Sequence, residues 1–287
     1  MQIPKGSPVS VDLSTGTGAA EPRTSRSRLV DFVKQNERLL LGALGIVTVL
    51  AAWEVVVQLG IMRRSTMSSP SGIYSKIISE FFENGRIYGY LWVTLRAYLI
   101  GLGIATVVGI PLGFIGGWSR RAAHLLEPWL AGLNATPTVA IVPLIILWLG
   151  IGQTSKVFIV FLFAVFPYAF NTMIGVRQSE AVFIDVARSF NAPKAHIIRT
   201  IVLPGAVPYI LTGARLAVGR ALIGVVVAEL IASNSGLGFL ISIASGTFDT
   251  PLLMLSVLIV GMFGLIMAEL MKRVERQFDK WRPVRAE

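Results

Sequence analysis

The sequence predicts an all-helical, polytopic membrane protein with about six transmembrane helices. Of its 287 residues, 54% are hydrophobic and 15% are charged, whereas a soluble domain is usually about a quarter charged because its surface faces water. The apolar residues gather in runs of roughly 20, enough to cross about 30 Å of hydrocarbon. The net charge of +10 is spread over tails and connections, as in membrane proteins. It does not gather on one basic domain, so we expect no nucleic-acid partner.

The chain begins with a polar segment. Residues 1–37 are rich in Ser, Thr, Gly and Pro, a composition typical of a disordered tail, which we expect to be cytoplasmic. The apolar run behind it, Leu39–Leu59, is longer than the core of a signal peptide, so we expect an uncleaved first span. Residues 38–90 then comprise this span and an extracytoplasmic segment. Within that segment, Ile73–Phe82 has a helical period and predicts a short interfacial helix.

Five further apolar runs predict the remaining spans. They are Ala97–Trp118, Leu125–Gly150, Val157–Gly175, Tyr209–Ala232 and Leu252–Met271. The run Leu125–Gly150 contains three prolines, at 128, 137 and 143, which invite kinks.

Two of these spans carry rows of small residues at every fourth position. One row is Gly101, Ala105, Gly109, Gly113 and Gly117, and the other is Gly213, Ala217 and Ala221. Small residues let helix backbones approach closely in lipid. Both rows therefore predict packing seams.

The distribution of Lys and Arg sets the expected orientation. With the N-terminus inside, the outer side holds only Arg63, Arg64, Lys76, Arg86 and Lys156. The inner side holds many more: Lys5, Arg23, Arg26, Arg28, Lys34, Arg38, Arg120, Arg121, Arg177, Arg188, Lys194, Arg199, Lys272, Arg273, Arg276, Lys280, Arg282 and Arg285. We therefore expect both termini to be cytoplasmic, with a C-terminal tail over residues 273–287.

Residues 179–208, between the fourth and fifth spans, are too polar to cross a bilayer and too regularly patterned for a slack loop. Apolar positions recur there at helical spacing: Phe183, Val186, Ala187 and Phe190. Pro193 suits the first turn of a second short helix, and we expect Pro204 to end that helix. An amphipathic helix pair can lie along lipid headgroups, or it can be a docking site that transmits force to both spans. The residues alone leave both alternatives open.

The same segment resembles the cytoplasmic loop of ABC importer permeases, whose pattern is Glu-Ala-Ala, three residues, Gly, nine residues and Ile-x-Leu-Pro. The matching positions here are Asp185, Val186, Ala187, Asn191, Ile201, Leu203 and Pro204. Asp keeps the charge of Glu, and Asn is the next most tolerant residue after Gly in a left-handed turn. The resemblance extends over roughly residues 69–271, where the chain is similar to the nitrate/sulfonate/taurine/bicarbonate branch of these permeases.

This resemblance implies a type I ABC importer transmembrane domain, with a core over residues 91–272 and a coupling loop over residues 179–204. It implies a permease that moves a small anionic or zwitterionic solute, such as nitrate, a sulfonate, taurine or bicarbonate, across a bacterial inner membrane by alternating access. The implied partners are ABC ATPase subunits that bind ATP and magnesium, a second permease subunit (expected to be a second copy), an extracytoplasmic solute-binding protein and membrane lipid.

We expect the chain itself to be no enzyme and to bind no cofactor or metal. The nearest approach to a phosphate-binding loop, Gly150–Lys156, has Ser155 in place of the second Gly, and Val157 follows where Ser or Thr is needed. The sequence has no cysteine, which excludes thiolate metal sites. Its two histidines, His124 and His196, belong to no carboxylate–histidine cluster.

Polar residues within the spans are candidates for a translocation pathway, because a charge at mid-membrane costs about 2.5–3.5 kcal/mol on insertion scales and needs a partner or a cavity. The candidates are Asn134, Thr136, Arg220 and Glu229. For Arg220, one hypothesis is a pathway contact with an anionic solute. The favoured alternative is pairing with another helix or with a second subunit.

Two other functions remain possible from the residues. An ion-gradient-driven secondary transporter would show midplane acidic residues or broken helices in repeated halves, and the sequence has no convincing internal repeat. A membrane scaffold without transport activity could use residues 179–208 as a signalling dock.

Overall fold

The structure is a computed structural model, and it describes residues 37–62, 66–179, 181–231 and 233–278. Most of the two predicted cytoplasmic tails, namely residues 1–36 and 279–287, lies outside the described residues. The chain divides into two units, Met1–Ala52 and Trp53–Glu287. The candidate sites considered below lie in the second unit.

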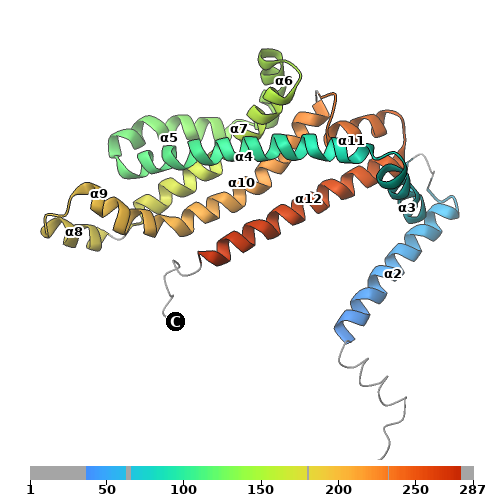
Figure 1. Ribbon diagram of the computed structural model, residues 1–287, viewed down its shortest axis with the longest axis horizontal. Coiled ribbons are helices and arrows are strands. Elements are labelled where there is room, and N and C mark those ends of the chain that lie inside the picture. The colour runs from blue at the N-terminus through green and yellow to red at the C-terminus, as the bar shows by residue number, and fades with distance from the viewer. Residues whose placement is uncertain (1–36, 63–65, 180, 232, 279–287) are drawn as a thin grey trace, which may run out of the picture. The chain divides into compact units, whose positions relative to one another are not determined.

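The described part of the chain is helical and contains no strand (Figure 1). The elements are α2 (Glu37–Gln58), α3 (Pro70–Ile78), η1 (Ser79–Glu83), α4 (Arg86–Trp118), α5 (Arg120–Ala135), α6 (Thr138–Leu149), α7 (Gln153–Arg177), α8 (Ala181–Ser189), α9 (Lys194–Ile197), η2 (Ile198–Val202), α10 (Leu203–Ile231), α11 (Leu237–Gly246) and α12 (Thr250–Gln277). The elements η1 and η2 are π-helices.

Helices α2, α4, α7, α10 and α12 are each long and apolar enough to cross a membrane. They confirm five of the predicted spans, although α4 starts at Arg86 rather than Ala97 and α12 continues past Met271 to Gln277. The predicted interfacial helix is also present, as α3 and η1.

The remaining predicted span, Leu125–Gly150, is interrupted, as its prolines led us to expect. Helices α5 and α6 meet at an angle of 96°, with a break at Thr136 and Pro137. A proline has no N–H for the helical ladder and its ring clashes with the preceding turn. The other two prolines lie inside α5 and α6 without ending them.

Helix α7 is the centre of the second unit, held between α4 and α10, and it is the most buried of the candidate spans. Both predicted packing seams are confirmed. A Cβ added to Gly109 of α4 would lie 2.7 Å from Tyr168 Cβ, and one added to Gly213 of α10 would lie 2.9 Å from the Pro167 carbonyl oxygen. These approaches are closer than a side chain tolerates, so the glycines set the helix spacing.

The order of these contacts fixes the helix directions. Gly101 of α4 faces Val160 and Gly117 faces Val176, so α4 and α7 run parallel. The chain must therefore return along the bundle between them. Helices α5 and α6 connect the two, and together they are long and apolar enough to count as one candidate span. The described residues thus contain five candidate spans, or six if the bent pair is one span, which agrees with the prediction of about six.

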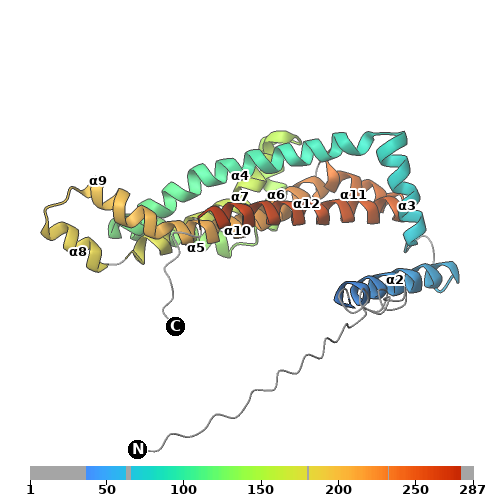
Figure 2. The same cartoon turned by 60° about the horizontal axis from the view of Figure 1, so that its bottom comes forward.

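The two ends of the second unit differ (Figures 1 and 2). Helices α8 and α9 lie at one end, beside the ends of α7 and α10, whereas α3 and α11 lie at the other. Helix α11 was not predicted. Its inner face, Leu240 and Ala244, packs against Ile87 and Leu252 at the starts of α4 and α12.

Pro204 does not end a helix, contrary to expectation. Residues Lys194–Ile231 form one uninterrupted helical stretch through η2. There, the Leu203 N–H donates to the Ile198 carbonyl, five residues back. This wider turn, typical of π-helices, lets the helix continue past a proline that has no N–H to donate.

Candidate functional site

The loop that resembles the permease coupling loop is a helix–turn–helix. Helix α8 ends in a Schellman motif, in which the Asn191 N–H donates to the Arg188 carbonyl at 2.9 Å and the Ala192 N–H donates to the Ala187 carbonyl at 3.0 Å. This motif requires a left-handed residue at position 191, and Asn191 has φ of 52°. The expected left-handed turn is confirmed, and Asn replaces Gly there at small cost.

The loop is fastened to the ends of the spans. Ile184 and Ala187 of α8 pack in one apolar cluster with Val176 of α7, Val202 of η2 and Trp118 of α4. Ala187 and Ala192, which close the Schellman motif, belong to the same cluster. The loop is therefore held against the ends of these three helices and is not a free segment.

The opposite face of α8 is exposed and apolar. Phe183, Val186 and Phe190 are 55%, 50% and 84% exposed. Asp185, on the side of the helix, pairs with Arg188 at 3.3 Å, and both side chains are exposed. An apolar patch on a firmly held helix pair is typical of an interaction surface.

The remaining positions of the family-like pattern lie beyond the turn. Ile201 is half-buried in η2 against the cluster that anchors α8. Leu203 is exposed and Pro204 half-buried at the start of α10. The pattern thus extends over the helix with the exposed apolar face, the turn and the first residues of a candidate span.

Two of the pathway candidates meet. The Arg220 Nη1 of α10 donates to Asn134 Oδ1 of α5 at 3.0 Å. Both residues are exposed, and Thr136 lies two positions further along at the break between α5 and α6. The structure therefore shows Arg220 paired with another helix, on a face that this single chain leaves uncovered.

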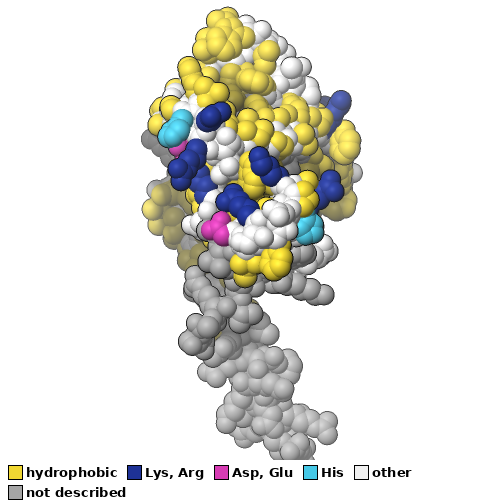
Figure 3. Space-filling model, turned by 90° about the vertical axis from the view of Figure 1, so that its left-hand side faces the viewer, with side chains coloured by type: hydrophobic (Ala, Val, Ile, Leu, Met, Phe, Trp, Pro, Cys, Tyr) yellow, Lys and Arg dark blue, Asp and Glu magenta, His cyan; other side chains and the backbone are white. Residues whose placement is uncertain are grey.

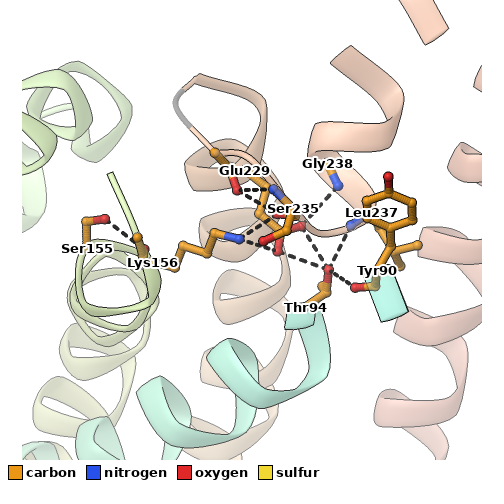
Figure 4. A network of polar contacts seen from close by, with 10 residues as sticks. Tyr90, Thr94, Ser155, Lys156, Glu229, Ser235, Leu237 and Gly238 are labelled. Carbon is orange, nitrogen blue, oxygen red and sulfur yellow. Dashed lines mark hydrogen bonds and ion pairs between the residues drawn. The ribbon is translucent and has the colours of Figure 1, made fainter. Parts of the chain in front are cut away.

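Glu229, the fourth pathway candidate, lies elsewhere, in a buried polar network (Figure 4). Its side chain is 0% exposed and pairs with Lys156 Nζ at 3.4 Å. The Thr94 hydroxyl lies 2.9 Å from Oε2, and the Gly238 N–H donates to the same oxygen at 3.0 Å. The Lys156 ammonium also donates to the Ser235 carbonyl at 2.6 Å.

This network joins α4, α7, α10 and the connection into α11. The connection must pass close to the carboxylate: a Cβ on Gly238 would lie 2.7 Å from Glu229 Cβ, and one on Gly236 would collide with the Glu229 carboxylate. Gly236 also has φ of 109°, which favours glycine. These glycines explain how a buried carboxylate receives donors from a loop.

Sequence reasoning missed Lys156, which was placed among the exposed cations of the outer loops. It is the fourth residue of α7 and is 2% exposed. A second missed pair is Arg215 of α10 with Glu275 of α12, joined through Nε to Oε1 at 2.8 Å and through a second contact from Nη2. The available signal was the presence of charges of both signs in apolar spans, which in lipid need partners.

Comparison with known proteins agrees with this architecture. Residues 109–282 match the family described as binding-protein-dependent transport system inner membrane component. The chain is 36% identical to a probable ABC transporter permease of Brucella melitensis over 69% of this chain and 80% of that one. It is 32% identical to a putative aliphatic sulfonates transport permease of Bacillus subtilis, over 82% and 84%. It is 28% identical to a nitrate import permease of Synechocystis, over 89% and 94%.

Solved structures support the same fold. A subunit of the MetNI methionine ABC transporter, in an inward facing conformation, has a TM-score of 0.59 and 14% identity, with 67% of this chain and 95% of that chain covered. An amino acid ABC transporter has a TM-score of 0.57 and 17% identity, covering 70% and 98%. The helical fold is therefore that of type I ABC importer membrane subunits. Together with the family match, this shows that the chain belongs to the binding-protein-dependent transport system inner membrane components, the permease subunits of ABC importers.

Proposed function

We propose that residues 179–204 couple this permease to ATP hydrolysis on partner ABC ATPase subunits. The observation that carries the proposal is the two-sided helix α8. One face is anchored to the ends of α4, α7 and η2, and the other presents Phe183, Val186 and Phe190 to a partner. A stiff element with an exposed apolar face transmits the movement of whatever binds it. ATP and magnesium then belong to the partner, and this chain catalyses no reaction.

The movement is alternating access in this proposal. ATP closes the ATPase dimer, the coupling loop follows, and the spans open outward to receive solute from an extracytoplasmic binding protein. Hydrolysis then resets the bundle. The close fit of α7 between α4 and α10 supports movement of these helices as one body, because tightly packed cores shift between discrete states rather than deform.

A second copy of the chain completes the pathway. Arg220 and Asn134 are exposed in the single chain, and so are the nearby Gly219 of α10 and Gly132 of α5, where an added Cβ would meet nothing within 4 Å. A guanidinium facing lipid is costly, and exposed small residues permit close helix contact. Both features favour burial of the surface around Arg220 against another permease subunit, which would place Arg220 at or beside the pathway.

The solute in this proposal is a small anion or zwitterion. Relatives named for aliphatic sulfonates and nitrate support this class. Taurine and bicarbonate share the same charge character. The Arg220 guanidinium suits an oxyanion.

The location is a bacterial inner membrane, with both termini cytoplasmic and residues 91–272 forming the transport core. Six crossings put both ends of the described chain on one side. Lys156 is buried and so no longer counts among the cations of the outer loops. The α8–α9 side therefore exceeds the other side in Lys and Arg by one more residue, which supports a cytoplasmic position for α8 and α9.

Cross-linking tests the proposal directly, because the chain has no cysteine of its own. We expect Phe190→Cys to cross-link to an ABC ATPase subunit in membranes that transport solute, while a cysteine at exposed Ser245 near the other end of the bundle does not. Solute uptake into vesicles should require ATP. Uptake without ATP would indicate a gradient-driven transporter, and transport-competent membranes without any ATPase contact at residue 190 would refute the coupling role.

A further inference from the structure

A cavity lies behind the coupling loop, away from the pathway candidates. Its volume is about 870 Å³. Three segments line it: the end of α4 with the start of α5, the end of α7, and the α8–α9 pair. The docking face of α8 points away from it, because the cavity takes Ile184, Asp185 and Arg188 whereas Phe183, Val186 and Phe190 do not line it.

The charges around this cavity are predominantly positive. Figure 3 looks onto this end of the molecule, where Lys and Arg side chains outnumber the acidic ones. Both carboxylates of the lining are already neutralised: Glu127 pairs with Arg177 at 2.5 Å, and Asp185 pairs with Arg188 at 3.3 Å.

Two other cations line the cavity, Arg120 and Lys194. Within the part of the chain that the structure describes, neither the Arg120 nor the Lys194 side chain has an ion-pair or hydrogen-bond partner. One belongs to α5 and the other to the coupling loop. His124, one turn along α5, adds a further polar ring to the same wall. Unpaired cations that line one cavity from two different segments favour an anion in it.

The position at the ends of the spans indicates the kind of anion. Trp118 lines the cavity, and tryptophan is enriched at the level of lipid headgroups. Basic pockets between transmembrane helices on the cytoplasmic side bind anionic headgroups.

We propose that this cavity binds a phosphate group between Arg120 and Lys194, and so ties the coupling loop to the start of α5. The inside position rests on the orientation proposed above. The phosphate can come from an acidic phospholipid of the inner leaflet or from a soluble phosphate compound, and both sources present the same charge and geometry to the two cations. A bound phosphate would stiffen the loop on the side opposite its docking face.

The test compares two double variants of the full-length chain that remove the same charge. Arg120→Gln with Lys194→Gln removes the unpaired cations of the cavity. Arg121→Gln with Arg199→Gln removes exposed cations from the same two segments outside the lining. Each protein is placed in nanodiscs of phosphatidylcholine, with or without phosphatidylglycerol. Native mass spectrometry measures retained phosphatidylglycerol, and calorimetry in phosphatidylcholine alone measures inorganic phosphate binding.

We expect the cavity variant to bind phosphatidylglycerol or inorganic phosphate roughly 30-fold more weakly than the unaltered chain, because each basic residue near an anionic headgroup contributes about a fivefold factor in affinity. The matched variant should bind both probes as the unaltered chain does. Loss confined to phosphatidylglycerol assigns a lipid, and loss confined to inorganic phosphate assigns a soluble source. Equal loss in both variants, or no binding of either probe, overturns the proposal. Neither measurement uses an ATPase subunit, so failure here is distinct from failure of the coupling role.

Discussion

Position 191 shows how one backbone angle shapes the proposed coupling loop, residues 179–204. Among the described residues, only Asn191 and Phe248 have a positive φ without being glycine. Each is the left-handed residue of a Schellman motif: the Asp249 N–H donates to the Ala244 carbonyl at 2.9 Å, as the Ala192 N–H does to Ala187. Asn adopts this conformation readily and a bulky aromatic residue does not. The exposed Phe248 is therefore strained, and nothing in the sequence marked it.

Substitution at position 191 should separate backbone strain from side-chain chemistry. We expect Asn191→Val to cost about 1–2 kcal/mol, because a branched side chain collides with the backbone in the left-handed region. Asn191→Gly should fold at least as well as the original chain. Thermal unfolding in detergent and ATP-dependent uptake measure the two effects. If the valine and glycine variants behave alike, the left-handed turn does not determine the loop.

The buried ion pair makes a second prediction at this scale. Lys156→Met leaves the fully buried Glu229 carboxylate without its cation, and we expect a loss of about 3–5 kcal/mol of folding free energy. Adding Glu229→Gln should restore most of it, since the uncompensated charge is then gone.

Lys76→Met is the matched control for Lys156→Met. Lys76 pairs with Asp249 at 2.8 Å, but the side chains are 26% and 33% exposed, so its loss should cost at most about 1 kcal/mol. Thermal unfolding of the four proteins gives the comparison. Equal losses for the two lysine variants, or no recovery in the double variant, would contradict a desolvated pair.

At the scale of helices, hydropathy and residue spacing predicted much of the fold. Five spans and the two small-residue seams follow from local pattern alone, because lipid exposure and close backbone approach each select residue types directly. The 96° break was not predicted as such. Prolines at 128 and 143 look equivalent to Pro137 in the sequence, yet only Pro137 lies at the break. Helix α11 was missed because its ten residues are too short for a span.

The seam between α4 and α7 can be tested by a single methyl group. We expect Gly113→Ala to cost about 1–3 kcal/mol, because the new Cβ would collide with the Ala169 carbonyl oxygen and backbone cannot move aside. Gly103→Ala on the same helix is the control, since a Cβ there meets nothing within 4 Å. It should be neutral or slightly stabilising. Unfolding temperature and the yield of monodisperse protein measure both. A tolerated alanine at position 113 would mean that the helices are not held this closely.

For the whole molecule, the sequence predicted the helix pair of residues 179–204 but not which charged residues of the spans form pairs. The loop was recognisable because its pattern is local and its spacing fixed. The pairing of Lys156 with Glu229, or of Arg215 with Glu275, depends on which helices become neighbours. The packing of α7 against α10 brings the first pair together, and the packing of α10 against α12 brings the second pair together. The cavity behind α8 depends on the same arrangement, since three separate segments supply its walls.

The parallel course of α4 and α7 leads to a prediction about the whole topology. If both helices descend towards the α8–α9 end, the bent pair α5–α6 must carry the chain back across the membrane, and residue 151 must emerge outside. The cysteine-free chain allows each side to be labelled by one introduced thiol. In intact cells, a membrane-impermeant maleimide should label Ile151→Cys and Ser245→Cys, whose positions are exposed. It should label Ala195→Cys in the coupling loop only after the membrane is opened. Labelling of residue 151 from the same side as residue 195 would make α5–α6 a re-entrant loop. That result would also break the parallel pairing of α4 with α7, because a chain that never crosses between them cannot run both in one direction.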